Sequence, residues 1–164
     1  MRMLESEPAS SHTGPMLRPL PALFLLFAAA IGCAPSQFTV QLLGADDLNP
    51  DPFTKTPSPV QVRAYFTRGR QAIEGAEFEA LWVKEGEALG GELVTRAAPA
   101  IEVPVGKNQQ WLLTPPDGAK FVTLVAKFNK IDGKDWRVVM DFDQAQSGPI
   151  EVGAYAIKAP RPRP

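Results

Sequence analysis

A single cysteine, Cys33, is the residue whose type and position point to a specific covalent chemistry. It follows an almost uninterrupted apolar run over residues 20–31, and the small residues Ala30 and Gly32 stand just before it. The run holds 12 residues, whereas a helix needs about 20 to cross a bilayer. With Arg18 ahead of it, the segment has the layout of a secretory signal that a peptidase removes.

The end of this segment resembles a lipobox, the processing site of bacterial lipoproteins, although Ala30 stands where Leu is more common. In a lipobox the cysteine sulfur takes a diacylglycerol and the freed amine takes a third acyl chain. One chain binds a membrane only marginally, at about 0.8 kcal/mol per buried methylene, so three chains would anchor the protein essentially permanently. We therefore predict a signal peptide over residues 1–32, lipidation at Cys33, and a tether over 33–36. The alternative is an ordinary secretory signal followed by an incidental buried cysteine.

The first fifteen residues do not suit an exported protein. Glu5 and Glu7 place negative charge ahead of a signal that favours positive charge. Met16 is the better start, and we interpret the residues before it as an extension of the true reading frame.

Composition excludes several function classes. The chain has 17 Lys and Arg against 18 Asp and Glu, so it carries no basic stripe of the kind that binds nucleic acid. The single histidine, His12, lies in the predicted signal peptide. Without a histidine or a second cysteine, the mature chain has no Ser-His-Asp triad, no Cys-His pair and no usual zinc site. We therefore expect neither an enzyme nor a cofactor or metal.

Period-two alternation of apolar residues predicts a mainly β fold. It is clearest over residues 59–67, where Val60, Val62 and Ala64 share one face and Arg63 and Tyr65 lie on the other. Turn residues separate the candidates, and strands of this number and length favour a β-sandwich over residues 37–158. The predicted strands cover residues 37–44, 59–67, 100–105, 109–114, 120–129, 135–143 and 149–158.

Three other segments complete this interpretation. Phe78, Leu81 and Trp82 have helical spacing, which predicts a short helix over 75–85 inserted between the second and third strands. On the strand over 135–143, we expect Trp136 to face the core and Arg137 to face solvent or a neighbouring carboxylate. Residues 159–164 form a Pro/Arg tail with polyproline character.

A resemblance to a known family covers most of the mature chain. The residues that carry it follow the lipobox in order: Leu48-Asn49-Pro50-Asp51, Pro57-Ser58-Pro59-Val60, Val62-Arg63-Ala64-Tyr65, Ala76-Glu77-Phe78 with Leu81, Leu89-Gly90, Gly106, Val125-Ala126-Lys127-Phe128 and Trp136-Arg137. No single motif is specific, but their order and spacing are discriminating. The chain resembles the TssJ family of type VI secretion lipoproteins.

This resemblance implies a transthyretin-like or immunoglobulin-like β-sandwich with a short inserted helix, held at the periplasmic face of the outer membrane. It implies a tether for the periplasmic part of the inner-membrane protein TssM, in a complex with TssL. Ala34 is not the Asp that commonly retains lipoproteins at the inner membrane, so outer-membrane sorting is expected. The alternative is a generic periplasmic lipoprotein whose sandwich binds another envelope protein or a carbohydrate.

The family resemblance places partner contact in the loop between the first two strands, residues 45–58. Prolines restrict its backbone, and a stiff loop loses less entropy on binding. Leu48 and Phe53 either anchor a partner or pack the loop onto its own sandwich. Asp47, Asn49 and Asp51 match the first half of a calcium loop, but Pro52 and Ser58 do not match the second half. The candidate partner-binding residues are Asp46, Asp47, Leu48, Asn49, Pro50, Asp51, Pro52, Phe53, Thr54 and Lys55.

Overall fold

Alternating apolar and polar residues build the first of two sheets. Strand β1 (Phe38–Gly44) buries every second side chain and exposes those between, as a strand with one face on a core does. It pairs antiparallel with β5 (Asn108–Leu113) and parallel with β8 (Ile150–Val152), and β8 pairs with β9 (Ile157–Lys158). The sheet order is therefore β5-β1-β8-β9.

The second sheet is built around β2 (Val60–Thr67) and β6 (Phe121–Lys127), which pair antiparallel along their length. A short connection leads from β6 to β7 (Arg137–Asp141), while β3 (Leu93–Arg96) and β4 (Ile101–Val103) both pair with β2. The order is β3-β2-β6-β7, with β4 beside β2.

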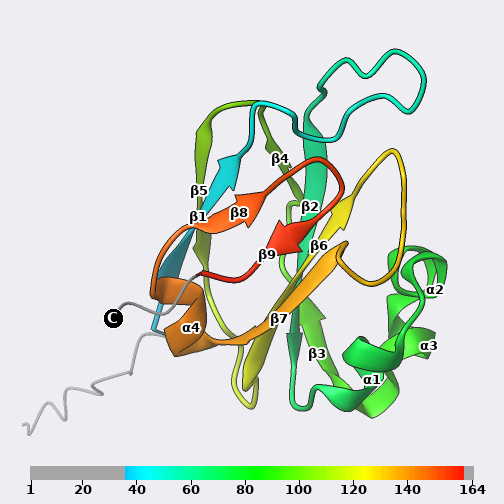
Figure 1. Cartoon of the computed structure of the whole chain (residues 1–164). Coiled ribbons are helices and arrows are strands. Elements are labelled where there is room, and N and C mark those ends of the chain that lie inside the picture. The colour runs from blue at the N-terminus through cyan, green and yellow to red at the C-terminus, as the bar shows by residue number, and fades with distance from the viewer. Residues whose placement is uncertain (1–35, 161–164) are drawn as a thin grey trace, which may run out of the picture. The chain divides into compact units, whose positions relative to one another are not determined.

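The structure, a computed structural model, describes residues 36–160 (Figure 1). The predicted signal peptide, Cys33, most of the tether and residues 161–164 lie outside this part. Buried side chains from both sheets form one core, with Val40 and Leu42 from β1, Val62 from β2, Leu124 from β6 and Ile150 from β8. The mainly β fold and the sandwich predicted from the sequence are confirmed.

The helical insertion is larger than the single helix predicted over residues 75–85. It contains α1 (Gln71–Gly75), α2 (Phe78–Val83), α3 (Glu85–Leu89) and a 3₁₀ turn, η1 (Gly90–Glu92). Gly75 ends α1, and the extended backbone at Ala76 and Glu77 separates α1 from α2. No helix within residues 36–160 is long and apolar enough to cross a membrane.

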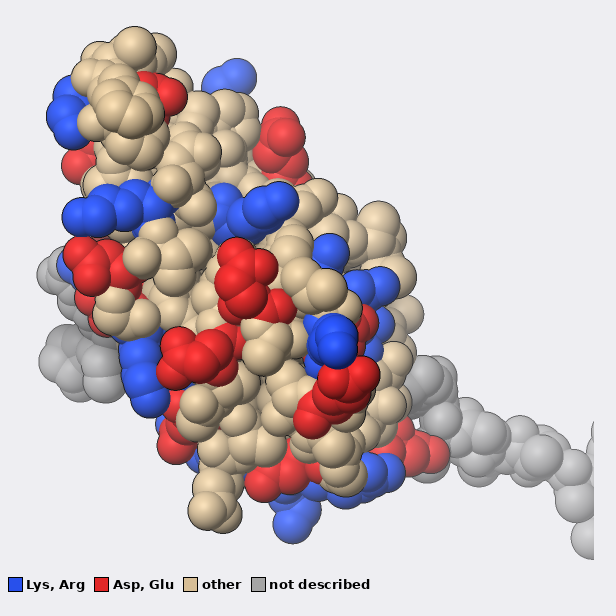
Figure 2. All heavy atoms as spheres, turned by 90° about the vertical axis from the view of Figure 1, so that its right-hand side faces the viewer, with Lys and Arg blue, Asp and Glu red and all other residues tan. Residues whose placement is uncertain are grey.

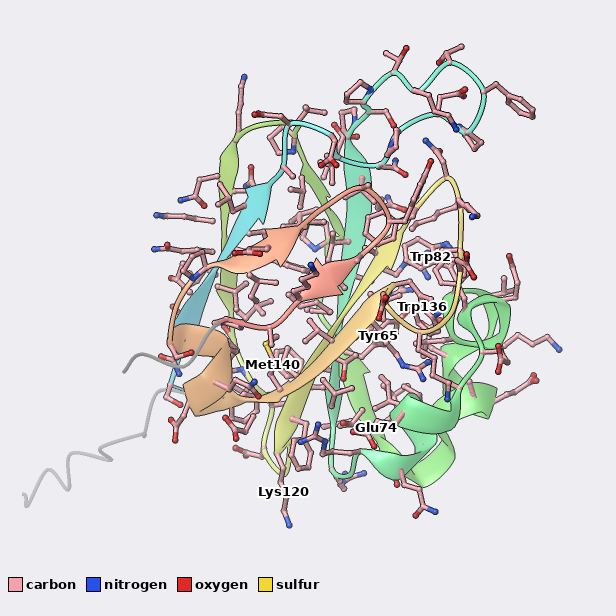
Figure 3. The ribbon with its side chains drawn as sticks, in the orientation of Figure 1. Tyr65, Glu74, Trp82, Lys120, Trp136 and Met140 are labelled. Atoms are coloured by element: carbon pink, nitrogen blue, oxygen red, sulfur yellow. The ribbon has the colours of Figure 1, made fainter. Side chains whose placement is uncertain are left out.

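The insertion covers part of the outer face of the second sheet. Tyr65 lies on the face of β2 opposite the sandwich core, as alternation predicts, yet its side chain is fully buried and its hydroxyl donates to the carbonyl of Leu81 at 3.3 Å. This burial raises the pKa of Tyr65 above its ordinary value. The Phe78 ring lies 5.5 Å from the Trp82 ring and 5.3 Å from the Trp136 ring, so the helices and the sheet share a small aromatic cluster (Figure 3).

Three segments differ from the predicted strands. β3 was not predicted, because Leu93–Arg96 is short and half exposed. The predicted strand over 135–143 ends at Asp141, whose side chain accepts a hydrogen bond from the Gln144 amide and caps α4 (Phe142–Gln146). The predicted strand over 149–158 is two short strands, β8 and β9, joined by a turn.

Arg137 was predicted to face solvent or a carboxylate, and this prediction is wrong. Its side chain is 8% exposed and donates to the main-chain carbonyls of Glu74 and Ala76, at the end of α1. Its guanidinium also lies 4.4 Å from the centre of the Trp136 ring. Because the helices cover this face, the charge binds carbonyls at a helix C-terminus, where a cation is favoured.

We predict that Arg137→Met lowers the free energy of unfolding by about 1–3 kcal/mol, because the charged hydrogen bonds from Arg137 to two part-buried carbonyls are lost. Urea denaturation measures this change. The matched control is Arg70→Met, which removes an exposed ion pair with Glu74 and should cost less than about 1 kcal/mol. Equal losses in the two variants would show that Arg137 does not hold the insertion to the sheet.

Candidate functional site

The loop between β1 and β2 projects from one end of the sandwich (Figure 1). Its two arms are joined by main-chain hydrogen bonds: the Ser58 amide donates to the Leu48 carbonyl at 3.0 Å, and the Asp51 amide donates to the Thr56 carbonyl at 2.9 Å. The Lys55 amide then donates to the Asp51 carbonyl at 3.0 Å. The loop therefore has a hairpin-like stem and a tip at residues 52–55.

Asn49 holds the base of this loop. Its side-chain amide donates to Ser58 Oγ at 3.1 Å and to the Pro59 carbonyl at 3.0 Å. Its side-chain oxygen accepts from the Asn129 amide at 2.6 Å, and its main-chain carbonyl accepts from Ser58 Oγ and from Asn129 Nδ2. Its backbone has a φ of 43°, a left-handed conformation that Asn tolerates better than most residues. Every polar group of the buried Asn49 side chain is thus satisfied.

A second set of contacts ties the loop to the turn between β8 and β9. The Tyr155 hydroxyl donates to the Pro50 carbonyl at 2.9 Å, and the main-chain N–H of Asn49 donates to the Gly153 carbonyl at 3.4 Å. Sequence analysis missed the roles of Asn129 and Tyr155, because they lie 80 and 105 residues from their loop partners. The loop is consequently held on two sides by segments distant in the sequence.

The two apolar residues of the loop have different surroundings. Leu48 is 0% exposed and belongs to the sandwich core, so it packs the loop onto its own domain. Phe53 is 92% exposed at the tip. Of the two candidate anchors, only Phe53 has an exposed side chain.

The tip has its own local hydrogen bonds. One Asp51 carboxylate oxygen accepts from the Thr54 amide at 2.8 Å and from the Phe53 amide at 2.9 Å. These donors hold the pKa of the Asp51 carboxyl below its ordinary value of 3.8. Lys55 has a φ of 62°, and its ammonium donates to the Pro52 carbonyl at 2.7 Å. The backbone on both sides of Phe53 is therefore fixed.

Two of the three residues that match the first half of a calcium loop make hydrogen bonds within the loop instead. The Asn49 side chain is buried in the loop base and Asp51 binds the tip amides, while Asp47 points to a separate groove. Within residues 36–160, no three acidic, histidine or cysteine side chains are grouped as a metal site.

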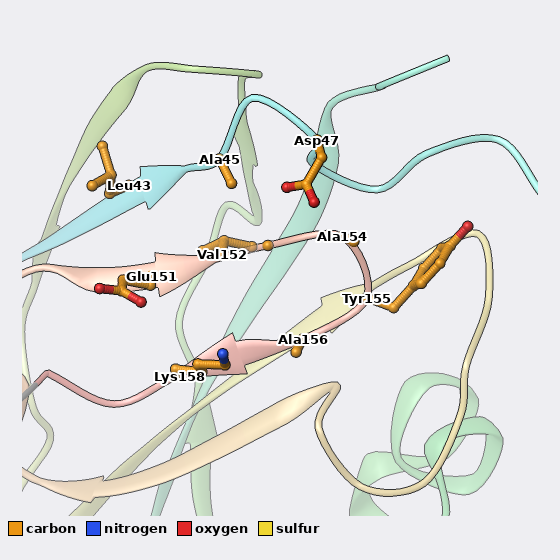
Figure 4. Close-up of a pocket in the computed structure, with 10 residues that line it drawn as sticks. Leu43, Ala45, Asp47, Glu151, Val152, Ala154, Tyr155, Ala156 and Lys158 are labelled. Atoms are coloured by element: carbon orange, nitrogen blue, oxygen red, sulfur yellow. The ribbon is translucent and has the colours of Figure 1, made fainter. Parts of the chain in front are cut away.

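A groove of about 470 Å³ lies beside the loop on the outer face of the first sheet (Figure 4). Asp47 and Tyr155 line the end next to the loop, and Leu43 and Lys158 line the strands. The turn between β8 and β9 does not fill the groove, because the side chains of Ala154 and Ala156 are small. In the sequence, only the run of small residues around Tyr155 could have indicated the groove, because period-two alternation gives no sign of it.

Charge gives no further site on the side of the domain that carries the helices. Figure 2 shows Lys and Arg interspersed with Asp and Glu there, without a large patch of one sign. Within residues 36–160, the features that could serve recognition at the loop are thus a rigid, exposed Phe53 and an adjoining groove.

We predict that Asn49→Asp lowers the free energy of unfolding by about 1–3 kcal/mol. Aspartate tolerates the backbone conformation but its carboxylate donates no hydrogen bond. The Pro59 carbonyl then loses the Asn49 donor, and Ser58 Oγ keeps, as an acceptor, only the hydrogen bond from Asn129 Nδ2. Chemical denaturation measures the loss. The control Asp47→Asn, an exposed change in the same loop, should stay within about 0.5 kcal/mol of wild type. A variant as stable as the control would mean that the Asn49 amide does not hold the loop.

Comparison with known proteins gives one family and several solved structures. Residues 36–156 match the family described as type VI secretion lipoprotein, VasD, EvfM, TssJ. The lipoprotein TssJ1 from Pseudomonas aeruginosa is 26% identical, with a TM-score of 0.66 over 80% of this chain and 100% of that one. No protein of curated function matches the sequence significantly.

Two further structures are similar in fold. The Lip protein of Serratia marcescens, titled as a membrane-bound component of the type VI secretion system, is 17% identical, with a TM-score of 0.66 over 77% of this chain and 99% of that one. A chain in a structure titled as the TssM C-terminal domain from EAEC is 22% identical, with a TM-score of 0.64 over 76% and 98% of the two chains.

The family match spans most of the described domain, including the loop, the helical insertion and every strand except β9. On this basis the chain belongs to the TssJ family of type VI secretion lipoproteins.

Proposed function

We propose that this chain is the outer-membrane lipoprotein of a type VI secretion membrane complex and that it tethers the periplasmic part of a TssM-like protein, with TssL in the same complex. Chains of this fold occur in structures titled as the type VI membrane complex and as a TssM C-terminal domain. The single observation that carries the proposal is the exposed Phe53 on a loop fixed before any partner arrives.

The loop suits a binding role on energetic grounds. An exposed aromatic side chain can bury a large apolar area in a partner pocket. Ordering a loop on binding consumes part of that gain, but the hydrogen bonds of Asn49, Asp51 and Tyr155 already order this one. A rigid anchor therefore retains more of its contact energy as affinity.

The loop leaves β1 at the end opposite to the one at which the chain enters the strand. Cys33 is five residue steps from the start of β1 at Phe38, a reach of at most about 18 Å. β1 then runs to Gly44, where the loop begins, and a strand of this length spans about 20 Å. The loop thus follows the end of β1 that is farther along the chain from Cys33, which suits contact with a periplasmic partner.

We predict that Phe53→Asp weakens capture of the TssM-like periplasmic domain at least about tenfold, because a central aromatic anchor contributes much of an interface's energy. The free energy of unfolding should stay within about 1 kcal/mol of wild type, as for most exposed substitutions. Pull-down and thermal denaturation measure the two quantities.

The matched control is Val83→Asp, which makes a similar change at a residue that is 66% exposed on α2. Capture should be unchanged in this variant. Equal capture by wild type and Phe53→Asp, or unfolding of Phe53→Asp, would count against Phe53 as an anchor.

We also predict that Cys33→Ser abolishes acylation and releases the protein from the membrane, because no other cysteine exists to take the lipid. Membrane fractionation and intact mass measure the outcome. Continued membrane retention of a protein without lipid would contradict the proposed anchor.

A further inference from the structure

The outer edge of β5 is unusually open among the described residues. β5 pairs only with β1, and in an antiparallel pair every second residue points its N–H and C=O away from its partner strand. Among residues 36–160, no main-chain hydrogen bond outside the strand pairings reaches a residue of β5. The six-residue strand therefore presents a row of main-chain groups along one side of the domain (Figure 1).

Other strands at sheet edges are shorter or charged. β9 has two residues and β4 has three, with Glu102 at its centre. β3 ends in Arg96, and β7 carries Arg137 and Asp141. Proteins commonly protect edges with short strands, charges, proline or bulges. The β5 sequence Asn-Gln-Gln-Trp-Leu-Leu has none of these features.

The side chains of β5 add an apolar contact to this edge. Leu112 is 59% exposed on the outer face, whereas Trp111 and Leu113 face the core. The Gln109 side chain donates to the Gln110 carbonyl at 3.1 Å, a bond from the strand itself that a competing backbone can displace. An exposed leucine and open main-chain groups together suit a second extended chain.

We propose that β5 accepts an extended segment of the TssM-like partner as an added strand. This inference rests on the proposed function and names a second contact for the same partner. Main-chain hydrogen bonds would select an extended backbone, and Leu112 would select an aliphatic side chain on the outer face. The absence of charge on β5 means that recognition there uses no ion pair.

The partner that contacts the loop can reach β5 without leaving the surface. The Gly44 amide donates to the Lys107 carbonyl at 3.0 Å, and the Gly106 amide donates to the Ala45 carbonyl at 3.2 Å. The first residues of the loop therefore lie beside the turn that opens β5. A segment that leaves the loop can continue along this edge toward the other end of the domain.

A second copy of this chain is the competing occupant of the edge, through antiparallel pairing of β5 with itself about a twofold axis. The hydrogen bonds that join the start of the loop to the turn before β5 favour the partner that the loop contacts. The experiment below distinguishes the two occupants.

The test measures the affinity of the lipidated protein for the purified periplasmic domain of its TssM-like partner. Leu112→Lys places a charge on the edge and should raise the Kd at least about tenfold, since edge lysines block strand addition. The control Thr39→Lys adds the same charge on the same face, at the β1 residue paired with Leu112. Thr39→Lys and Leu112→Val should stay within about twofold of wild type.

Hydrogen exchange of the β5 amides supplies the main-chain readout, and exchange should slow in the complex. Tight wild-type binding with unchanged β5 exchange and unchanged Leu112→Lys affinity would overturn strand addition and leave the proposed function intact. Failure of wild type to bind would overturn both. Sedimentation that shows self-association, lost in Leu112→Lys, would assign the edge to a second copy and also overturn the proposal.

Discussion

The side chain of Asn49 is the interaction on which the loop depends. One buried amide joins both arms of the loop to each other and to Asn129, which follows β6. A buried polar group is costly unless all its hydrogen bonds are made, and here they are. The exposed tip can therefore keep a fixed shape although Phe53 itself contacts little of the domain.

The outer faces of the two sheets differ: the second sheet packs against the helical insertion, and the first carries features suited to recognition. The helical insertion packs on the second sheet through Tyr65, Trp82 and Arg137. Within residues 36–160, no helix covers the outer face of the first sheet, which carries the groove, Leu43 and the exposed edge of β5. The loop contacts both sheets, and its hydrogen bonds to Gly153 and Tyr155 place it next to this groove.

Local sequence pattern predicted the sandwich because period-two alternation directly reports a strand with one buried face. It also placed a helix between the second and third predicted strands, but it left open whether Leu48 and Phe53 pack on the sandwich or face outward. It placed Tyr65 on the correct face without indicating its burial, and it failed for Arg137, because the helices that cover this face meet it only in the folded chain. Likewise, Asn129 and Tyr155 reach the loop only through the fold, so nothing in their own neighbourhood indicated their contacts.

The most direct test of the loop's role uses a photo-crosslinking amino acid in the intact envelope. Placed at position 53, it should form an adduct with the TssM-like protein, whereas the same residue at position 83 on α2 should not. Absence of the adduct at position 53, or equal adducts at both positions, would contradict the proposal that the tip of the loop binds the partner.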